Sequence, residues 1–328
     1  MKIMVYEARP DERADLEKQA ALHGVELSVT DAVPTLENAS LAAGCIGVSI
    51  LGQGCIDAAL LDAYHALGIR YLSTRTIGYD HIDLDHARSI GLRVCSASYA
   101  PNGVADFTVM MILMCLRHYK QALWRGQVND FSLTGLQGRE MKDLTIGIIG
   151  TGRIGAQVAR NLSGFGCRIL AYDLRRNPAV EPQVTYVDFD TLLAQSDVIT
   201  LHMPLLDSNR HIINRESISR MKDGVLIINC SRGELADIEA LIEGIETGKI
   251  GALGMDTVEG DEGIIHADHR VDILPNRNWF YLHQFRNVIM TQHMAFYTEQ
   301  SVDSMVQCGV EGLVKMAEEG SYKTMLNK

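Results

Sequence analysis

The 328-residue sequence has no apolar run close to the roughly 20 residues that a membrane-spanning helix needs. Its most hydrophobic stretch, Val109 to Leu116, is far too short. The first residues, Met1 to Glu7, are typical of a short strand and not of a signal sequence. We therefore expect a cytoplasmic protein that has no membrane partner.

The sequence also lacks a cysteine motif and an excess of positive charge. The seven cysteines are odd in number and scattered, without a Cys-X-X-Cys pair, so neither a disulfide framework nor a structural zinc site is indicated, and a reducing compartment fits best. Lys and Arg number 30 against 41 Asp and Glu, a formal net charge of −11. This charge argues against nucleic acid as the main partner, although an anionic small substrate responds to its local site and is not excluded.

Short apolar runs alternate with amphipathic segments along most of the chain, whose length is ample for two domains. Such βα units predict parallel sheets covered by helices, an α/β fold of two domains. The expected strands are 2–6, 25–29, 46–50, 71–73, 92–95, 145–149, 168–172, 198–201, 225–229, 251–255 and 288–291. The helices expected between the first strands are 12–23, 56–67 and 84–90.

A glycine motif, Gly150-Thr-Gly-Arg-Ile-Gly155, directly follows the strand at 145–149, and Asp173 ends the next one. In this context Gly150 allows a tight turn, Gly152 lets the backbone approach a pyrophosphate, and Gly155 lets helix and strand pack closely. The helix N-terminus offers free amides to the phosphates. Asp173 would accept hydrogen bonds from an adenosine ribose and favours NAD. Arg175 and Arg176 follow at once, however, and could bind a 2′-phosphate.

Three polar residues stand where later strands end: Arg232, Asp256 and His293. Because the carboxyl ends of parallel strands share one edge of a sheet, all three are expected at the edge that carries the glycine loop. Arginine can hold a carboxylate with two hydrogen bonds, and histidine can deliver a proton near neutral pH. An acid beside the histidine would stabilise its charged form.

One further cluster has residue types that bind metals: His266, Asp268, His269 and Asp272. It lies in a polar stretch between strands without a second pair of ligands. We therefore interpret it as a solvated loop and predict no metal.

Two helices bear on how the domains assemble. The segment from Val104 to about Trp124 is apolar on most of its circumference, which predicts a buried helix. We expect it to serve both as an interdomain core helix and as a subunit interface of a homodimer. The last helix, about 298–319, could pack on the cofactor domain or cross back to the first domain; the residue pattern alone leaves both open.

Four stretches together resemble the D-isomer-specific 2-hydroxyacid dehydrogenase family, and within it most of all the D-lactate dehydrogenases, including those of vancomycin-resistance gene clusters. They are residues 73–83 (STRTIGYDHID), 150–155, 229–233 (NCSRG) and 291–297 (TQHMAFY). The resemblance implies a Rossmann NAD-binding domain, residues 101–297, inserted into a flavodoxin-like substrate domain made of residues 1–100 and 298–328. It also implies that the last helix crosses back and that two copies pair through the nucleotide domain.

The resemblance further implies a role for each matching residue. Arg232 would bind the substrate carboxylate and carbonyl, His293 would donate the proton, and Asp261 would be the acid partner of that histidine. The residues expected to bind substrate are Ile77, Gly78, Tyr99 and Phe296. Those expected to bind NAD are Gly150, Gly152, Arg153, Ile154, Gly155, Asp173, His202, Pro204, Cys230 and Asp256, the last at the nicotinamide carboxamide.

This sequence departs from the family pattern at its acid and beside its histidine. Asp261 stands where glutamate is usual, so its carboxylate is one methylene shorter, and Glu259 or Glu262 could substitute for it. Gln292 replaces the usual proline and Met294 the usual threonine. These changes bear on rate and pH profile more than on the type of reaction.

The expected function is the NADH-dependent reduction of a 2-oxo acid, first of all pyruvate, to the D-2-hydroxy acid. Pocket width would depend on side chains near Arg9, Leu51, Tyr99 and Phe296. Gly52 and Gly54 suggest an unobstructed loop, which leaves larger branched or aromatic 2-oxo acids as an alternative. An NAD-sensing co-regulator without turnover is a second alternative, which the set Arg232, Asp261 and His293 disfavours.

Overall fold

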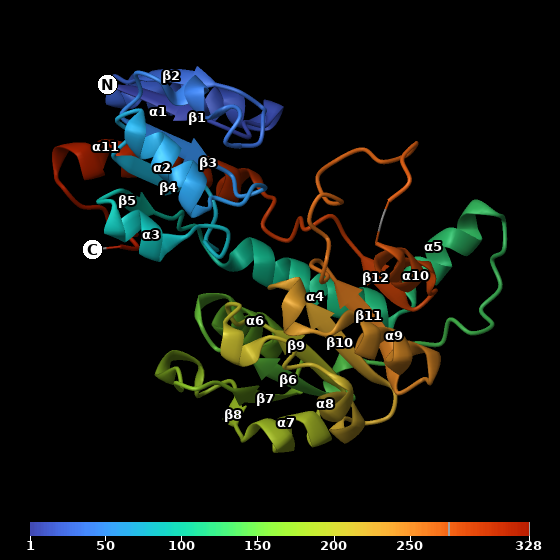
Figure 1. The fold of residues 1–328 in the computed structure, drawn as a ribbon. Coiled ribbons are helices and arrows are strands. Elements are labelled where there is room, and N and C mark those ends of the chain that lie inside the picture. The colour runs from blue at the N-terminus through green and yellow to red at the C-terminus, as the bar shows by residue number, and fades with distance from the viewer. Residues whose placement is uncertain (275, 328) are drawn as a thin grey trace. The chain divides into compact units, whose positions relative to one another are not determined.

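The structure, a computed structural model, describes residues 1–274 and 276–327, and the chain divides into two compact units. The first unit consists of Met1–Ala100 and Tyr297–Lys328, and the second of Pro101–Phe296 (Figure 1). Each unit is an α/β structure with its own sheet, as the alternation of strands and helices in the sequence predicts.

In the first unit the described residues form one parallel sheet of five strands in the order β2-β1-β3-β4-β5. This is the flavodoxin-like order that the family resemblance implies. The strands are β1 (Lys2–Val5), β2 (Glu26–Val29), β3 (Gly47–Ile50), β4 (Tyr71–Thr74) and β5 (Arg93–Cys95). The helices are α1 (Arg13–His23), α2 (Ala58–Ala66), α3 (Leu84–Ser89) and α11 (Glu299–Glu318).

The C-terminal helix α11 belongs to this first unit, where it packs against β3, β4 and α1. Small residues let it approach the sheet closely. A Cβ atom placed on Gly47 of β3 would lie 3.1 Å from the Leu313 side chain, and one placed on Gly309 of α11 would lie 2.8 Å from that of Arg75. Because both contacts are tighter than side chains normally tolerate, a larger residue at either position would force the neighbouring side chain to shift.

In the second unit the described residues form a parallel sheet of seven strands in the order β12-β11-β10-β9-β6-β7-β8. The strand order reverses between β6 and β9, so a ligand-binding crevice is expected at the carboxyl ends of these two strands. The strands are β6 (Thr145–Ile149), β7 (Arg168–Tyr172), β8 (Thr185–Tyr186), β9 (Val198–Leu201), β10 (Val225–Asn229), β11 (Ile250–Met255) and β12 (Val288–Met290).

Helices cover the second sheet, and its central strands are buried. Every residue of β9 and β10 is buried, which explains why these strands read as continuous apolar runs in the sequence. The helices are α4 (Asn102–Leu116), α5 (Tyr119–Gln127), α6 (Arg153–Ser163), α7 (Phe189–Gln195), α8 (Arg215–Arg220), α9 (Ile238–Glu246) and α10 (Arg277–Gln284). Within the described residues no helix has the length and apolar character to cross a membrane.

The prediction of one long buried helix from Val104 to Trp124 is wrong for its second half. The chain breaks at His118, which adopts a left-handed backbone conformation with φ of 49°, and α4 and α5 are separate helices. Helix α4 buries much of its surface, whereas α5 has no buried residue and exposes 65% of Trp124. The apolar pattern alone could not reveal this break, because His118 carries no helix-breaking signal.

Candidate active site

The glycine motif forms a tight turn at the carboxyl end of β6. Gly150 has φ of 94°, and a Cβ atom there would lie 2.6 Å from the carbonyl oxygen of His202. A Cβ atom on Gly155 would lie 1.9 Å from the carbonyl oxygen of Gly150. These two glycines are therefore required by the close packing of turn, strand and helix.

Gly152 differs from its neighbours because a Cβ atom on it would meet no protein atom within 4 Å. Gly152 is the N-cap of α6 and, as a glycine, has no side chain to cap the first amides of the helix. The helix begins with Arg153 and Ile154. The open space above Gly152 thus faces the first amides of an 11-residue helix, where anions are favoured. This arrangement fits a pyrophosphate.

Asp173 lies directly after β7 and is held beside the glycine turn. Its carboxylate accepts hydrogen bonds from the backbone amide of Thr151 at 2.6 Å and from the Thr151 hydroxyl at 3.1 Å. Its other oxygen accepts from the amide of Arg175 at 2.9 Å. The acid is therefore fixed at the edge where a ribose would lie, and the Arg176 guanidinium lies over the ring of Tyr186, 5.5 Å from the ring centroid.

His202 and Pro204 follow β9, the strand across the switch point from β6. The Nε2 atom of His202 is 2.9 Å from the Thr200 hydroxyl, while its buried Nδ1 atom has no hydrogen-bond partner within the part of the chain that the structure describes. Burial lowers the pKa of His202 to about 3, so its imidazole is neutral at physiological pH. A buried, unsatisfied ring nitrogen at this place fits a bound ligand.

Arg232 lies just beyond β10, on a turn that the Asn229 side chain organises. The Asn229 amide donates to the Arg232 carbonyl at 2.7 Å, and the Ser231 hydroxyl donates to the Met203 carbonyl at 2.6 Å. Gly233 then passes so close to the backbone of Val258 that a Cβ atom would lie 2.3 Å from its carbonyl carbon. The arginine turn is thereby packed against both the end of β9 and the segment that leads to Asp261.

Cys230 precedes this turn and is buried. Burial raises the pKa of its thiol far above the ordinary range, and the Asp256 carboxylate raises it further. The thiol is therefore protonated and unsuited to act as a nucleophile.

Asp256, at the end of β11, is 2% exposed and binds the segment that carries His293. One carboxylate oxygen accepts from the Thr291 hydroxyl at 2.6 Å and from the Met294 amide at 2.9 Å, and the other accepts from the Ala295 amide at 2.8 Å. Within this bracket His293 has φ of 52°, a left-handed conformation that few residues adopt.

Asp261 lies five residues after Asp256 and is partly buried. Burial is the main reason why its pKa rises to about 6; negative charges on Glu262, Glu234 and Asp256 add to the rise, and a hydrogen bond from the Val258 amide opposes it. A carboxyl group that titrates near neutral pH inside a polar site is typical of catalytic acids.

The two nearby glutamates that could replace Asp261 are placed differently. Glu259 is 2.6 Å from Nε2 of His211 and also accepts from the Ile238 amide at 3.4 Å, so it is engaged away from His293. Glu262 is exposed. Neither glutamate is therefore placed to replace Asp261, whose role as the acid partner of His293 stays a prediction.

His293 follows β12 and lies beside two aromatic rings. The ring of His266 is 6.1 Å from that of His293, and Phe296 meets both histidine rings edge-on at 6.4 and 6.3 Å. Nε2 of His266 is also 3.2 Å from the carbonyl oxygen of His293. The sequence interpretation of His266 as part of a solvated loop missed this contact; the residue is exposed, but it lies against the candidate proton donor.

The remaining residues expected to bind substrate lie in the first unit, beyond the carboxyl ends of β4 and β5. Ile77, Gly78 and Tyr99 are each partly buried. The carbonyl of Gly78 accepts a hydrogen bond from the Thr76 hydroxyl at 2.6 Å, which fixes this short turn. Among residues 1–274 and 276–327, the amides of Ile77 and Gly78 donate to no protein group.

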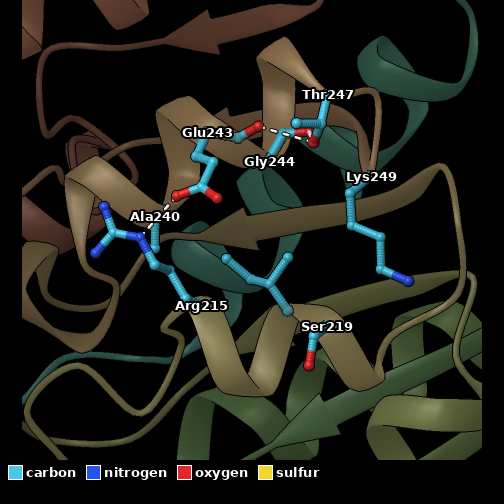
Figure 2. Close-up of a pocket in the computed structure, with 8 residues that line it drawn as sticks. Arg215, Ser219, Ala240, Glu243, Gly244, Thr247 and Lys249 are labelled. Carbon is cyan, nitrogen blue, oxygen red and sulfur yellow. Dashed lines mark hydrogen bonds and ion pairs between the residues drawn. The ribbon is translucent and has the colours of Figure 1, made fainter.

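A hollow of about 310 Å³ in the second unit lies elsewhere (Figure 2). Arg215, Glu243 and Lys249 line it between α8, α9 and the amino end of β11, at the edge of the sheet opposite to the glycine turn. Its arginine is already paired with Glu243 at 2.6 Å. We therefore do not assign the active site to this hollow.

Some residues that shape the site are not among those that the sequence analysis singled out as binding or catalytic. Thr291 and Thr151 anchor the two acids through side-chain hydrogen bonds, and His266 reaches His293 from 27 positions away. Only their places, at a strand end or within the glycine motif, point to them. Among the residues that the structure describes, no group of three or more His, Cys, Asp or Glu side chains is arranged to hold a metal ion.

Comparisons with known proteins agree with this geometry. Residues 109–295 match the family model described as D-isomer specific 2-hydroxyacid dehydrogenase, NAD binding domain. The chain is 40% identical over 327 residues to the aromatic 2-oxoacid reductase of Clostridium sporogenes, covering 98% of both chains. It is 36% identical to the D-lactate dehydrogenase of Escherichia coli, covering 95% of this chain and 96% of that one.

A solved structure leads to the same assignment. The D-isomer specific 2-hydroxyacid dehydrogenase of Lactobacillus delbrueckii ssp. bulgaricus, in its NAD complexed form, matches with a TM-score of 0.84 and 32% identity over 100% of both chains. These findings support an enzyme and not a co-regulator without turnover. The open space at Gly152, the fixed Asp173 and the unsatisfied His202 fit NAD as its cofactor. The chain belongs to the D-isomer specific 2-hydroxyacid dehydrogenase family and is an NAD-dependent D-2-hydroxyacid dehydrogenase.

Proposed function

We propose that this enzyme reduces a 2-oxo acid to the D-2-hydroxy acid, with pyruvate as the first candidate substrate and D-lactate as its product. The observation that carries the proposal is the grouping of Arg232, Asp261 and His293 on turns at one edge of the second sheet. The contacts of Gly233 and Asp256 link these turns to one another. The relationship to a D-lactate dehydrogenase supports pyruvate.

In this proposal Arg232 binds the carboxylate of the substrate through its planar guanidinium, which matches a carboxylate with two parallel hydrogen bonds. The amides of Ile77 and Gly78 also donate to that carboxylate, and Tyr99 and Phe296 line the substrate pocket. Binding the carboxylate at several points orients the 2-oxo group for reaction.

His293 donates a proton to the 2-oxo oxygen as negative charge develops there. Asp261 in its charged form stabilises the imidazolium, so the proton donor is present at neutral pH. NADH, when bound, supplies the hydride that reduces C2. The cofactor would be held by the glycine turn, including Arg153 and Ile154, and by Asp173, His202, Pro204, Cys230 and Asp256, the last at the nicotinamide carboxamide.

A bulkier 2-oxo acid with an aromatic side chain is the second candidate. The relative in Clostridium sporogenes carries the name aromatic 2-oxoacid reductase and is 40% identical. The loop Leu51–Gly54 has two glycines and Leu51 is only 5% exposed, so this loop presents little bulk to a substrate. These observations favour room for a larger side chain.

The test is the loss of NADH absorbance with pyruvate, 2-oxoisocaproate and phenylpyruvate measured side by side, and then with NADPH. The highest kcat/KM with pyruvate would support the first candidate, and the highest with phenylpyruvate the second. Near-full turnover in Arg232→Ala or His293→Ala would contradict the proposed roles of these residues, because general acid catalysis alone contributes about 10² to 10⁴ in rate.

We also propose that the enzyme is a cytoplasmic homodimer. Helix α5 and the chain after it expose large apolar side chains, including Trp124 at 65%, Phe131 at 79% and Leu133 at 84%. A group of this kind is typical of an interface, and a second copy is the occupant that we propose. Sedimentation equilibrium of the wild type and of Trp124→Glu tests this, since a monomeric wild type would exclude it. The seven free cysteines suit a reducing compartment.

A further inference from the structure

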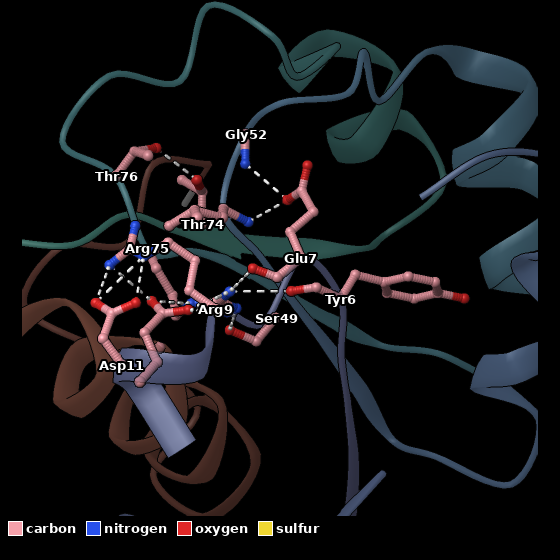
Figure 3. Close-up of polar contacts among 12 residues, drawn as sticks. Tyr6, Glu7, Arg9, Asp11, Ser49, Gly52, Thr74, Arg75 and Thr76 are labelled. Atoms are coloured by element: carbon pink, nitrogen blue, oxygen red, sulfur yellow. Dashed lines mark hydrogen bonds and ion pairs between the residues drawn. The ribbon is translucent and has the colours of Figure 1, made fainter. Parts of the chain in front are cut away.

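Glu7 is an unusual residue of the first unit: it is 2% exposed and has a left-handed backbone with φ of 54°. Its carboxylate accepts hydrogen bonds from four successive backbone amides, those of the loop Leu51–Gly54. Figure 3 shows the bond to Gly52. The distances are 2.9 Å to Gly52, 2.8 Å to Gln53 and 3.2 Å to Gly54. One side chain thus accepts hydrogen bonds from all four backbone amides of the loop.

The loop depends on such an anion for its shape. Successive amides that point the same way form a concave positive site, and their dipoles repel one another unless a negative charge lies between them. Gly52 has φ of 89°, and a Cβ atom there would lie 2.9 Å from the ring of His81. The loop is therefore confined between Glu7 on one side and His81 on the other.

Glu7 is itself held in place by a buried arginine. The Arg75 guanidinium is 0% exposed and donates to the Tyr6 carbonyl at 2.9 Å and to the Glu7 carbonyl at 3.1 Å (Figure 3). It also forms a 3.2 Å ion pair with Glu12, which is equally buried. These bonds hold the backbone of Glu7 in place, so the side chain extends to the loop from a fixed position.

The same network reaches the turn that carries Ile77 and Gly78. The Thr74 hydroxyl lies 3.3 Å from Nε2 of His81 and 2.6 Å from the Thr76 hydroxyl, which donates to the Gly78 carbonyl at 2.6 Å. If the loop moved at Gly52, His81 would therefore have to move as well. Through Thr74 and Thr76 this movement would also shift the turn that carries Ile77 and Gly78.

We propose that Glu7 is a positioning residue that sets the substrate specificity of the enzyme by fixing the loop Leu51–Gly54. The proposal rests on the proposed function, in which the Ile77 and Gly78 amides bind the 2-oxo acid and this loop borders its side chain. Glu7 acts through the loop and does not touch the substrate. Its effect therefore depends on the size of the substrate side chain and not only on the presence of a carboxylate.

The test compares Glu7→Gln with the wild type on pyruvate and phenylpyruvate. The amide keeps the shape of the side chain but replaces one accepting oxygen with a donor, which opposes two of the loop amides. The ratio of the two kcat/KM values is expected to change by about tenfold, because small displacements near the reacting groups have effects of this size. The Kd of NADH is expected to stay within about twofold, since the nucleotide turn lies in the other unit.

Two further variants make the outcome decisive. Glu17→Gln, at an exposed position on α1, is the matched control and should leave the ratio unchanged. Gly52→Ala disturbs the same loop from the His81 side, so it should change the ratio even if Glu7→Gln folds poorly. In the double variant the two effects should be less than multiplicative, because both act on one loop.

An unchanged ratio in both Glu7→Gln and Gly52→Ala, with NADH binding intact, would overturn the inference and leave Glu7 a purely structural residue. The same holds if kcat/KM falls by the same factor for pyruvate and for phenylpyruvate, because the ratio is then unchanged. The wild-type substrate profile tests the proposed function separately, since it identifies the preferred acid without reference to Glu7, and a preference for phenylpyruvate would leave the comparison of ratios intact.

Discussion

The Thr291 hydroxyl donates a 2.6 Å hydrogen bond to a carboxylate oxygen of Asp256. This bond joins the ends of the neighbouring strands β12 and β11. Two residues further along, His293 adopts a strained left-handed conformation, which persists only where its surroundings hold it. The pair therefore fixes the position of the candidate proton donor.

Replacing Thr291 by valine should slow the reaction as well as destabilise the fold. The loss of one hydrogen bond to a charged group should cost about 1.5 to 3 kcal/mol of unfolding free energy. Without this bond the segment that carries His293 is held less firmly. We expect kcat to fall about tenfold, since proton transfer depends on the position of the imidazole relative to the substrate. Thr247→Val is the matched control, because the Thr247 hydroxyl bonds the Glu243 carbonyl at the opposite edge of the sheet. Equal kcat values for the two variants would contradict a role for Thr291 in placing His293.

The pH profile should report Asp261. In the direction of 2-oxo acid reduction His293 must carry a proton and Asp261 a negative charge. Since the pKa of Asp261 is raised to about 6, its carboxylate becomes protonated and loses its charge as the pH falls below that value. The rate should therefore fall on the acid side with an apparent pKa near 6.

Asp261→Asn should remove the acid limb of this profile and lower kcat by about tenfold to a hundredfold. Asp261→Glu should keep the limb, because it restores the same charge with one more methylene. Glu259→Gln is the control: that carboxylate pairs with His211, so the acid limb should persist. An acid limb that survives in Asp261→Asn would identify a different group as its source.

Cofactor preference should depend on Asp173. Its carboxylate is fixed by Thr151 where it would repel a 2′-phosphate, while Arg175 and Arg176 lie next to it in the chain. Asp173→Ser should therefore raise kcat/KM with NADPH relative to NADH about tenfold or more. Asp190→Ser, an exposed acid of the same unit that pairs with Arg220, should leave this ratio unchanged. If the ratio also stays unchanged in Asp173→Ser, the acid does not select the cofactor.

The sequence predicts the sheets well because their strands are buried and apolar. Four of the strands of the second unit, including β9 and β10, have the bounds that the pattern predicts. The two-residue strand β8 is too short to produce a pattern of its own. His118 ends α4 through its backbone conformation, which residue type does not encode.

The candidate site is predictable to the extent that its residues follow strands or a glycine motif. Asp173, Arg232 and His293 meet that condition, and the structure places each at the carboxyl edge. Glu7 and His266 do not, because their importance comes from contacts with chain segments 44 or more and 27 positions away. Long-range pairing of this kind has no periodicity, so a single sequence cannot reveal it.

The buried pair of Arg75 and Glu12 should contribute to the stability of the first unit. Both side chains are 0% exposed, and they meet at 3.2 Å. Glu12→Gln should lower the unfolding free energy by about 3 to 5 kcal/mol, since it leaves the arginine charge buried without its partner. The matched control is Glu26→Gln, which breaks the ion pair between Lys2 and Glu26, side chains that are 38% and 69% exposed. This variant should lower the unfolding free energy by at most about 1 kcal/mol. Urea denaturation of both variants measures the difference. A loss as small for Glu12→Gln as for Glu26→Gln would mean that water or the remaining acceptors, the Tyr6 and Glu7 carbonyls and the Ser49 hydroxyl, compensate the arginine, and that the network beneath the loop Leu51–Gly54 does not need this pair.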